Sequence, residues 1–108
     1  MANLQLVDSE SWDEIVGQAV KPVVVEFSMQ NCQPCQVFGP ILNEVSKERE
    51  DILVVECKLE MAMELAQRYE IRSVPTVKVF VDGEAVSSKT GLMQKDELNE
   101  FVSGSLDG

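Results

Sequence analysis

Two cysteines separated by two residues are the groups in this sequence best suited to covalent chemistry. They lie in the segment Asn31-Cys32-Gln33-Pro34-Cys35, where a helical spacing of apolar residues begins. At that spacing the two sulfurs lie one helical turn apart, close enough to form a disulfide. The unpaired N–H groups and the positive dipole at a helix start stabilise a thiolate. We therefore expect Cys32 to be the better nucleophile and Cys35, on the inward face, to be the shielded, resolving thiol.

Thiol–disulfide exchange is the chemistry that this pair predicts. Cys32 would attack a substrate disulfide to form a mixed disulfide, and Cys35 would then attack Cys32 and release the reduced substrate. The exchange needs neither a metal nor a bound cofactor. Two alternatives are that the cysteines lie near each other by chance, or that they bind a metal across a dimer.

Composition argues against other kinds of site. A tetrahedral structural zinc site takes four Cys or His ligands, and the chain has three cysteines and no histidine, so we expect no metal site. The missing histidine also removes the usual general base of Cys–His and Ser–His hydrolases. The third cysteine, Cys57, lies in a predicted covered strand and is interpreted as a small apolar residue. A regulatory or dimer-forming thiol is the alternative.

The 108 residues carry 19 acidic and 9 basic side chains, a net charge of -10. This charge repels phosphate backbones and anionic membranes, so we expect neither nucleic acid nor a membrane as a partner. The length predicts one domain over residues 1–108, and we expect a monomer. The start lacks a basic segment followed by a long apolar one, and the apolar runs are too short to span a bilayer. Because the cysteine count also fits reducing conditions, we expect a cytoplasmic protein.

Alternating apolar patterns predict an α/β chain. Strands are predicted, in chain order, over residues 4–7, 23–27, 52–58, 76–81 and 84–90. Helices are predicted from a cap at Ser9 to Val16 or Ala19, from Cys32 onward with a kink at Pro40, across residues 61–69, and from about Gln94. Asp82-Gly83 is a strong hairpin-turn signal between the last two strands. The order βαβαβαββα predicts a mixed sheet, parallel in its first part and antiparallel in its last, with helices on both faces.

Motifs beyond the cysteine pair are shared with one known family. The shared positions, in chain order, are Phe27, Pro34, Pro40, the segment 69–76, Asp82-Gly83 and Thr90-Gly91. On these residues the chain resembles the thioredoxin family from about residue 4 to residue 103. The resemblance implies the thioredoxin fold, a central mixed five-stranded sheet flanked by four helices. It also implies reduction of protein disulfides with electrons from a thioredoxin-reductase-type donor.

The same resemblance implies a substrate groove beside the cysteines. Pro75 would be a cis proline packed beside the two sulfurs, and the backbone of Val74 would pair with an extended substrate segment. A trans Pro75 is the alternative that the local sequence alone favours. The residues implied to contact substrate are Asn31, Gln33, Pro34, Val37, Ser73, Val74, Pro75, Thr90 and Gly91.

Four positions around the cysteines depart from the family pattern, Glu26 among them. Asn31 and Ser28 stand where the family usually has tryptophans, and Gln33 stands where it usually has glycine. A more polar contact surface would narrow the choice of partners. The alternative function is therefore a thioredoxin-fold binding module, or a dedicated electron carrier for one specific partner.

Glu26 is a charged residue within an otherwise apolar strand, at the position where the family usually has a buried aspartate. Burial would raise its pKa by desolvation. We expect this carboxyl group to accept the proton of Cys35, directly or through water. The alternative is an ion pair at the strand end, with Lys58 as the partner.

Overall fold

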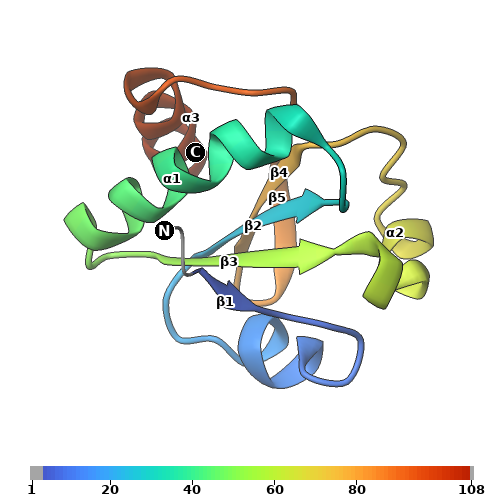
Figure 1. Cartoon of the computed structure of the whole chain (residues 1–108). Coiled ribbons are helices and arrows are strands. Elements are labelled where there is room, and N and C mark those ends of the chain that lie inside the picture. The colour runs from blue at the N-terminus through green and yellow to red at the C-terminus, as the bar shows by residue number, and fades with distance from the viewer. Residues whose placement is uncertain (1–3, 108) are drawn as a thin grey trace.

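A five-stranded mixed sheet runs through the centre of the molecule. In this computed structural model, which describes residues 4–107, the strands lie in the order β1-β3-β2-β4-β5 (Figure 1). Their bounds are Gln5–Leu6 for β1, Val23–Ser28 for β2, Leu53–Lys58 for β3, Thr76–Val81 for β4 and Glu84–Thr90 for β5. β1, β3 and β2 are parallel to one another, whereas β4 and β5 continue the sheet as an antiparallel hairpin.

Helices cover both faces of this sheet. Their bounds are Asp13–Gly17 for the π-helical turn η1, Gln33–Glu48 for α1, Leu59–Met61 for the 3₁₀ turn η2, Met63–Arg68 for α2 and Lys95–Asp107 for α3. α1 and α3 pack on one face, and η1 and α2 pack on the other (Figure 1). The predicted element order and the mixed sheet flanked by helices are confirmed. None of the helices within residues 4–107 has the length and apolarity needed to cross a membrane.

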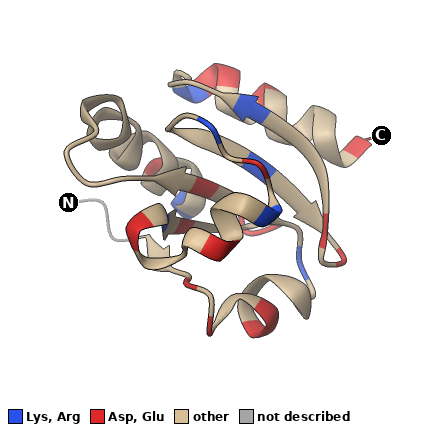
Figure 2. Cartoon of the chain, turned by 90° about the vertical axis from the view of Figure 1, so that its right-hand side faces the viewer, with Lys and Arg blue, Asp and Glu red and all other residues tan. Residues whose placement is uncertain are grey.

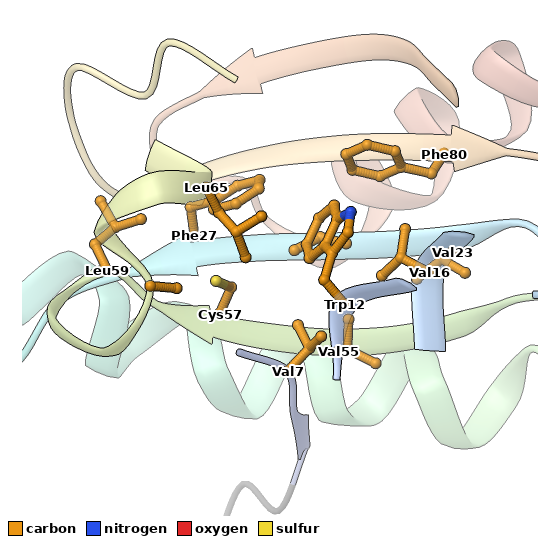
Figure 3. Close-up of a cluster of buried hydrophobic side chains, with 12 residues drawn as sticks. Val7, Trp12, Val16, Val23, Phe27, Val55, Cys57, Leu59, Leu65 and Phe80 are labelled. Carbon is orange, nitrogen blue, oxygen red and sulfur yellow. The ribbon is translucent and has the colours of Figure 1, made fainter. Parts of the chain in front are cut away.

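The central strand β2 is buried on both faces because each face meets a different helix layer. Val23, Val25 and Phe27 point into a cluster that also contains Trp12, beside η1 (Figure 3). Val24 points the other way, into the cluster formed with α1 and α3. The β-branched run therefore forms a covered strand, as its composition predicts.

Helix α1 begins at Gln33, one residue after the predicted start at Cys32, and continues through Pro40 for 16 residues. Proline has no N–H group and so removes one backbone hydrogen bond from the helix. The inward side chains of Phe38, Leu42 and Val45 are all buried against the sheet. This packing offsets the lost bond and holds the first turn of the helix over the ends of the central strands.

The first helix is shorter than the sequence predicts. Only Asp13–Gly17 is helical, and the prediction that Ser9 caps this helix was wrong. Asp8 accepts the hydrogen bonds instead: its Oδ1 is bonded by the backbone N–H groups of Glu10 and Ser11 and by the Ser11 hydroxyl. These bonds fold the segment into a turn, so the helix begins only after it.

Four other predicted elements differ in their bounds by one or two residues. β1 covers two residues of the predicted segment 4–7, β2 ends at Ser28 rather than at residue 27, and β3 begins at Leu53 rather than at residue 52. The helix predicted over residues 61–69 consists of α2 alone, preceded by η2 and separated from it by Ala62. These differences lie at element ends, where capping and fraying decide the bounds.

Candidate active site

The two cysteines of the Cys-x-x-Cys segment form a disulfide at the start of α1, with their Cα atoms 5.3 Å apart. Cys32 is the N-cap of the helix. Its Sγ accepts a hydrogen bond from the backbone N–H of Cys35 (3.3 Å), and its carbonyl oxygen accepts one from the N–H of Gln36 (3.1 Å). The predicted position at a helix start is confirmed, and the sulfur of Cys32 lies among the N–H groups that stabilise a thiolate.

The two sulfurs lie in different environments. Cys32 is half-buried, whereas Cys35 is only 7% exposed and lies on the same helix face as the fully buried Phe38. A disulfide of another protein therefore reaches Cys32 more easily than Cys35. This difference is what a division into an attacking thiol and a resolving thiol requires.

The residue before the pair has an unusual backbone conformation. Asn31 has a φ of 59°, in the left-handed region that asparagine tolerates better than most residues. Pro34 lies in the first helical turn, where its missing N–H group breaks no helical bond. Asn31, Gln33, Pro34 and Val37 are all exposed around this turn. They are accessible to a substrate, and their contact with one stays a prediction.

The loop before β4 carries a cis proline. The Val74–Pro75 peptide bond is cis, as the family resemblance implies. The carbonyl oxygen of Pro75 accepts a hydrogen bond from the N–H of Gly91 (2.8 Å), and Thr90 pairs with Thr76 in the β4–β5 register. Among the implied groove residues, Ser73 and Thr90 are exposed, Val74 and Gly91 are half-buried, and Pro75 is buried. The two loops that the resemblance assigns to one groove are therefore joined.

The sheet face that α1 covers changes from apolar to polar toward the ends of two strands. On this face β2 carries Val24, Glu26 and Ser28, and β3 carries Val54, Glu56 and Lys58. Glu26 is paired with Glu56 in the parallel register, and the Ser28 hydroxyl donates a hydrogen bond to Oε2 of Glu56 (2.7 Å). We call Glu26, Ser28, Glu56 and Lys58 the polar cluster. It lies at the carboxyl end of β2, where the chain leaves the sheet for the cysteine pair.

Glu26 is a buried carboxyl group with no partner of opposite charge among the described residues. It is 1% exposed, and its Oε2 accepts no hydrogen bond from any of them. Burial, with a smaller contribution from the negative charge of Glu56, raises the pKa of Glu26 to about 8. The predicted rise in pKa is confirmed. The alternative ion pair is not formed, because the neighbour across the strands is Glu56 and Lys58 lies two residues further along β3.

A cavity of about 400 Å³ opens beside Cys35. Its walls are formed by Met29, Gln30, Asn31, Cys35, Gln36, Glu56 and Lys58. The sequence analysis missed Glu56, although the alternation of side chains along a strand could have placed it on the same face as Val54. Residues 54 and 56 share a face, and a parallel neighbour of β2 brings Glu56 opposite Glu26.

The third cysteine lies on the opposite face of the sheet. Cys57 is fully buried in the cluster that contains Phe27 and Leu65 (Figure 3). Burial, with smaller contributions from the charges of Asp8 and Glu56, raises the pKa of the Cys57 thiol to about 11. The predicted burial of Cys57 in a covered strand is confirmed, and it agrees with the interpretation of this residue as a small apolar one.

Acidic positions are spread over helices, strands and turns rather than gathered in one patch (Figure 2). No group of three or more His, Cys, Asp or Glu side chains in the described part of the chain is arranged to hold a metal ion. The charged residues that line the cavity beside Cys35 are Glu56 and Lys58.

Comparison with known proteins agrees with this geometry. A family model described as thioredoxin matches residues 3–104. The chain is 40% identical to the thioredoxin of Mycoplasmoides gallisepticum, over 76% of this chain and 82% of that protein. It is 36% identical to the thioredoxin of Rickettsia bellii, over 93% and 96% of the two chains. It is 38% identical to a probable thioredoxin-2 of Caenorhabditis elegans, over 89% of this chain and 68% of that protein.

The matched range contains the disulfide at the start of α1, the cis proline and all five strands. The fold and the reduction of protein disulfides that the resemblance implies are thereby confirmed. The chain belongs to the thioredoxin family of thiol–disulfide oxidoreductases.

Proposed function

We propose that this protein is a cytoplasmic reductase of protein disulfides in which Cys32 is the attacking thiol and Cys35 the resolving thiol. The observation that carries the proposal is the position of the Cys32 sulfur at the N-terminus of α1, with Cys35 buried one turn further on. The protein acts as a monomer of one domain, residues 1–108, and takes electrons from a thioredoxin-reductase-type donor. It needs no bound cofactor, because the dithiol itself supplies both electrons.

The reaction moves two electrons from the dithiol to the substrate. The Cys32 thiolate attacks one sulfur of the substrate disulfide, a mixed disulfide forms, and the other substrate sulfur leaves as a thiolate. Cys35 then gives up its proton and attacks the sulfur of Cys32, and the second substrate sulfur leaves with the electron pair of the mixed disulfide. Both substrate thiolates take up protons, and the protein is left with a Cys32–Cys35 disulfide for the reductase to reduce.

Glu26 is the proposed acceptor of the Cys35 proton, directly or through water. Cys35 has to ionise in a buried position, where a thiolate is disfavoured, so a group that takes the proton speeds its attack. The pKa of Glu26, about 8, supports this role because it lies near neutral pH, where a group both gains and loses protons.

Substrate binding is assigned to the exposed first turn of α1 and to the loops at the ends of β4 and β5. The proposed contact residues are Asn31, Gln33, Pro34, Val37, Ser73, Val74, Pro75, Thr90 and Gly91. The proposal is supported by the exposed apolar side chain of Val37 and by the hydrogen bond between Gly91 and Pro75, which holds the two loops together. An extended substrate segment would pair with the backbone of Val74, as in strand addition.

A narrow range of partners is the alternative to the broad substrate range of a general reductase. Ser28 is buried and its hydroxyl is bonded to Glu56, so this position adds nothing to the contact surface. Asn31 presents a polar amide beside the cysteines. These two residues favour a dedicated electron carrier for one partner as the alternative to a general reductase.

Reduction of a protein disulfide, with dithiothreitol as the electron source, tests the roles of the cysteines. Cys32→Ser is expected to abolish catalysis, whereas Cys35→Ser is expected to accumulate a mixed disulfide with the substrate. Cys57→Ala is the matched control, because it removes a thiol from the opposite face of the sheet and is expected to retain activity. Wild-type activity in Cys32→Ser would refute the proposal.

Two further measurements test the direction of electron transfer and the range of protein partners. Equilibration in a glutathione redox buffer gives the potential of the dithiol, and a strongly oxidising potential would contradict a reductase. Capture of many different proteins by Cys35→Ser would contradict a dedicated carrier, and capture of one protein would support it.

A further inference from the structure

The cavity beside Cys35 contains a carboxylate that the reaction described above does not use. Among the described residues that line it, Glu56 has the only carboxyl group and Lys58 the only ammonium group. Glu26, by contrast, is 1% exposed and is not part of the cavity wall. The carboxyl group that shares this space with Cys35 is therefore that of Glu56.

Glu56 is also coupled to Glu26. The two residues are paired in the β2–β3 register, so their side chains leave the sheet next to each other on the face that α1 covers. The Ser28 hydroxyl holds one oxygen of Glu56 at 2.7 Å, whereas Oε2 of Glu26 has no partner among the residues 4–107. Besides burial, the negative charge of Glu56 raises the pKa of Glu26, so the charge on one carboxyl group acts on the other.

The charged surroundings of this carboxyl pair are simple. Lys58 follows on the same face of β3, half-buried and two residues beyond Glu56. The neighbouring strands place apolar residues opposite the pair, Val77 of β4 against Glu26 and Leu6 of β1 against Glu56. The segment 29–36 contributes only thiols, amides and apolar side chains. Lys58 is therefore the cation on the cavity side of the pair, and it also attracts Glu60, whose Oε2 accepts a hydrogen bond from the backbone N–H of the cavity-lining Gln30.

We propose that Glu26 and Glu56 act as one proton-accepting pair, in which Glu56 is the member that exchanges protons with Cys35 through the cavity and with solvent. The inference rests on the proposed reductase reaction and refines its resolving step: the Cys35 proton enters the carboxyl pair at Glu56, which lines the cavity, rather than at Glu26. At neutral pH Glu26, the more deeply buried member, holds its proton because its pKa is raised to about 8.

The resolving step balances without any further reagent. The S–H bond of Cys35 breaks, and its proton passes to the carboxylate of Glu56 across a space large enough for bridging water. The freed electron pair of Cys35 forms the bond to the Cys32 sulfur, and the bond to the substrate breaks with its electron pair on the substrate sulfur. Glu56 then releases the proton to solvent, and the pair returns to holding one proton.

A pH-jump experiment isolates this step. Thionitrobenzoate is attached to Cys32 as a mixed disulfide at low pH, the pH is raised, and the release of the coloured thiolate reports the attack by Cys35. In Glu56→Gln the release rate at pH 7 is expected to fall by about tenfold or more. The rate–pH profile is expected to move to higher pH, because Cys35 must then ionise without a carboxylate in the cavity.

The direction in which Glu56→Gln changes the release rate distinguishes the proposed pair from a mechanism in which Glu26 alone accepts the proton. The charge of Glu56 helps to raise the pKa of Glu26, so Glu56→Gln lowers that pKa and leaves more Glu26 ionised at pH 7. If Glu26 alone accepted the proton, Glu56→Gln would release thionitrobenzoate at the wild-type rate or faster, and that result would overturn the proposal. Glu56→Asp, which keeps a carboxyl group in the cavity, is expected to retain most of the wild-type profile. A profile like that of Glu56→Gln would contradict the proposal.

Two further variants and one measurement on the unmodified protein show whether a change in release rate is specific to Glu56. Glu64→Gln removes the same charge from an exposed position on α2 and is expected to leave the release rate unchanged. Cys35→Ser tests the function itself: wild-type release in that variant would refute Cys35 as the resolving thiol, whatever Glu56 does. In the unmodified protein, carboxyl-carbon NMR is expected to show Glu26 and Glu56 each responding to both ionisations. Two independent titrations would overturn the coupling even if a variant fails to fold.

Discussion

Ionisation of Glu26 inside the fold is expected to make the protein less stable as the pH rises. The side chain is 1% exposed, and its burial, with the charge of Glu56, raises its pKa from 4.5 to about 8. The folded state therefore binds the Glu26 proton more tightly than the unfolded state does. The stability gained from this proton is fully present below the unfolded-state pKa of 4.5 and is lost as the pH rises through about 8.

The size of the effect follows from the two pKa values. Each pH unit between them corresponds to about 1.4 kcal/mol. The free energy of unfolding is therefore expected to fall by roughly 4 kcal/mol between pH 5 and pH 9 from Glu26 alone. This is a large part of the total stability of about 5–15 kcal/mol that is typical of small domains.

Urea unfolding of the oxidised protein and of Glu26→Gln across this pH range measures the effect. Trp12, the only tryptophan, is buried against Tyr69 and Phe80, so its fluorescence reports the loss of the core. Any penalty for burying the amide of Glu26→Gln is the same at every pH and does not change the slope. The stability curves of the two proteins are expected to diverge by roughly 4 kcal/mol from pH 5 to pH 9. Glu64→Gln is expected to run parallel to the wild type, and parallel curves for Glu26→Gln as well would refute the reasoning.

Three further predictions concern residues outside the carboxyl pair. Cys57 is buried and its pKa is raised to about 11, so iodoacetamide is expected to modify Cys32 and not Cys57 in the folded, reduced protein; mass spectrometry that finds modified Cys57 would contradict this. Gly83→Ala is expected to lower the free energy of unfolding by about 1–3 kcal/mol, because Gly83 has a φ of +81° and an added Cβ would lie 2.8 Å from the carbonyl oxygen of Gly17. Equal urea midpoints for Gly83→Ala and the wild type would contradict this prediction and show that the β4–β5 hairpin accommodates the added Cβ. Asn31→Val is expected to destabilise the oxidised protein by about 1 kcal/mol, whereas Asn31→Gly is expected to be tolerated; the reverse order in urea unfolding would show that the φ of 59° is not what position 31 requires.

Local sequence patterns predict most of the fold because adjacent residues decide those features. The run 23–27 is apolar at both strand faces and forms the central, doubly covered strand. Asp82-Gly83 forms the predicted turn, with φ values of 53° and 81° that few other residues adopt. The cysteine pair begins a helix because the chain leaves β2 directly before it and the apolar spacing changes there.

Features that depend on competition between neighbours, or on contacts across the chain, are not predictable in this way. Asp8 and Ser9 are both good capping residues, and only the structure shows that Asp8 takes the local N–H groups. The cis bond before Pro75 is implied by family resemblance and not by the local residues. The role of Glu56 depends on the register between β2 and β3, which lie far apart in the sequence.

Strands β2 and β3, which carry the polar cluster, change from valine to glutamate within two residues on the face that α1 covers. Val24 and Val54 lie in the apolar core under α1, and the next residues on the same face are Glu26 and Glu56. An apolar pair at these positions would be at least as favourable for folding, because buried carboxyl groups without a cationic partner destabilise the folded state once they ionise. The carboxyl pair is instead found at the point of the sheet that adjoins the cavity of Cys35. If Glu26→Gln is both more stable at alkaline pH and slower to release thionitrobenzoate, the pair serves the thiol chemistry at the expense of the fold.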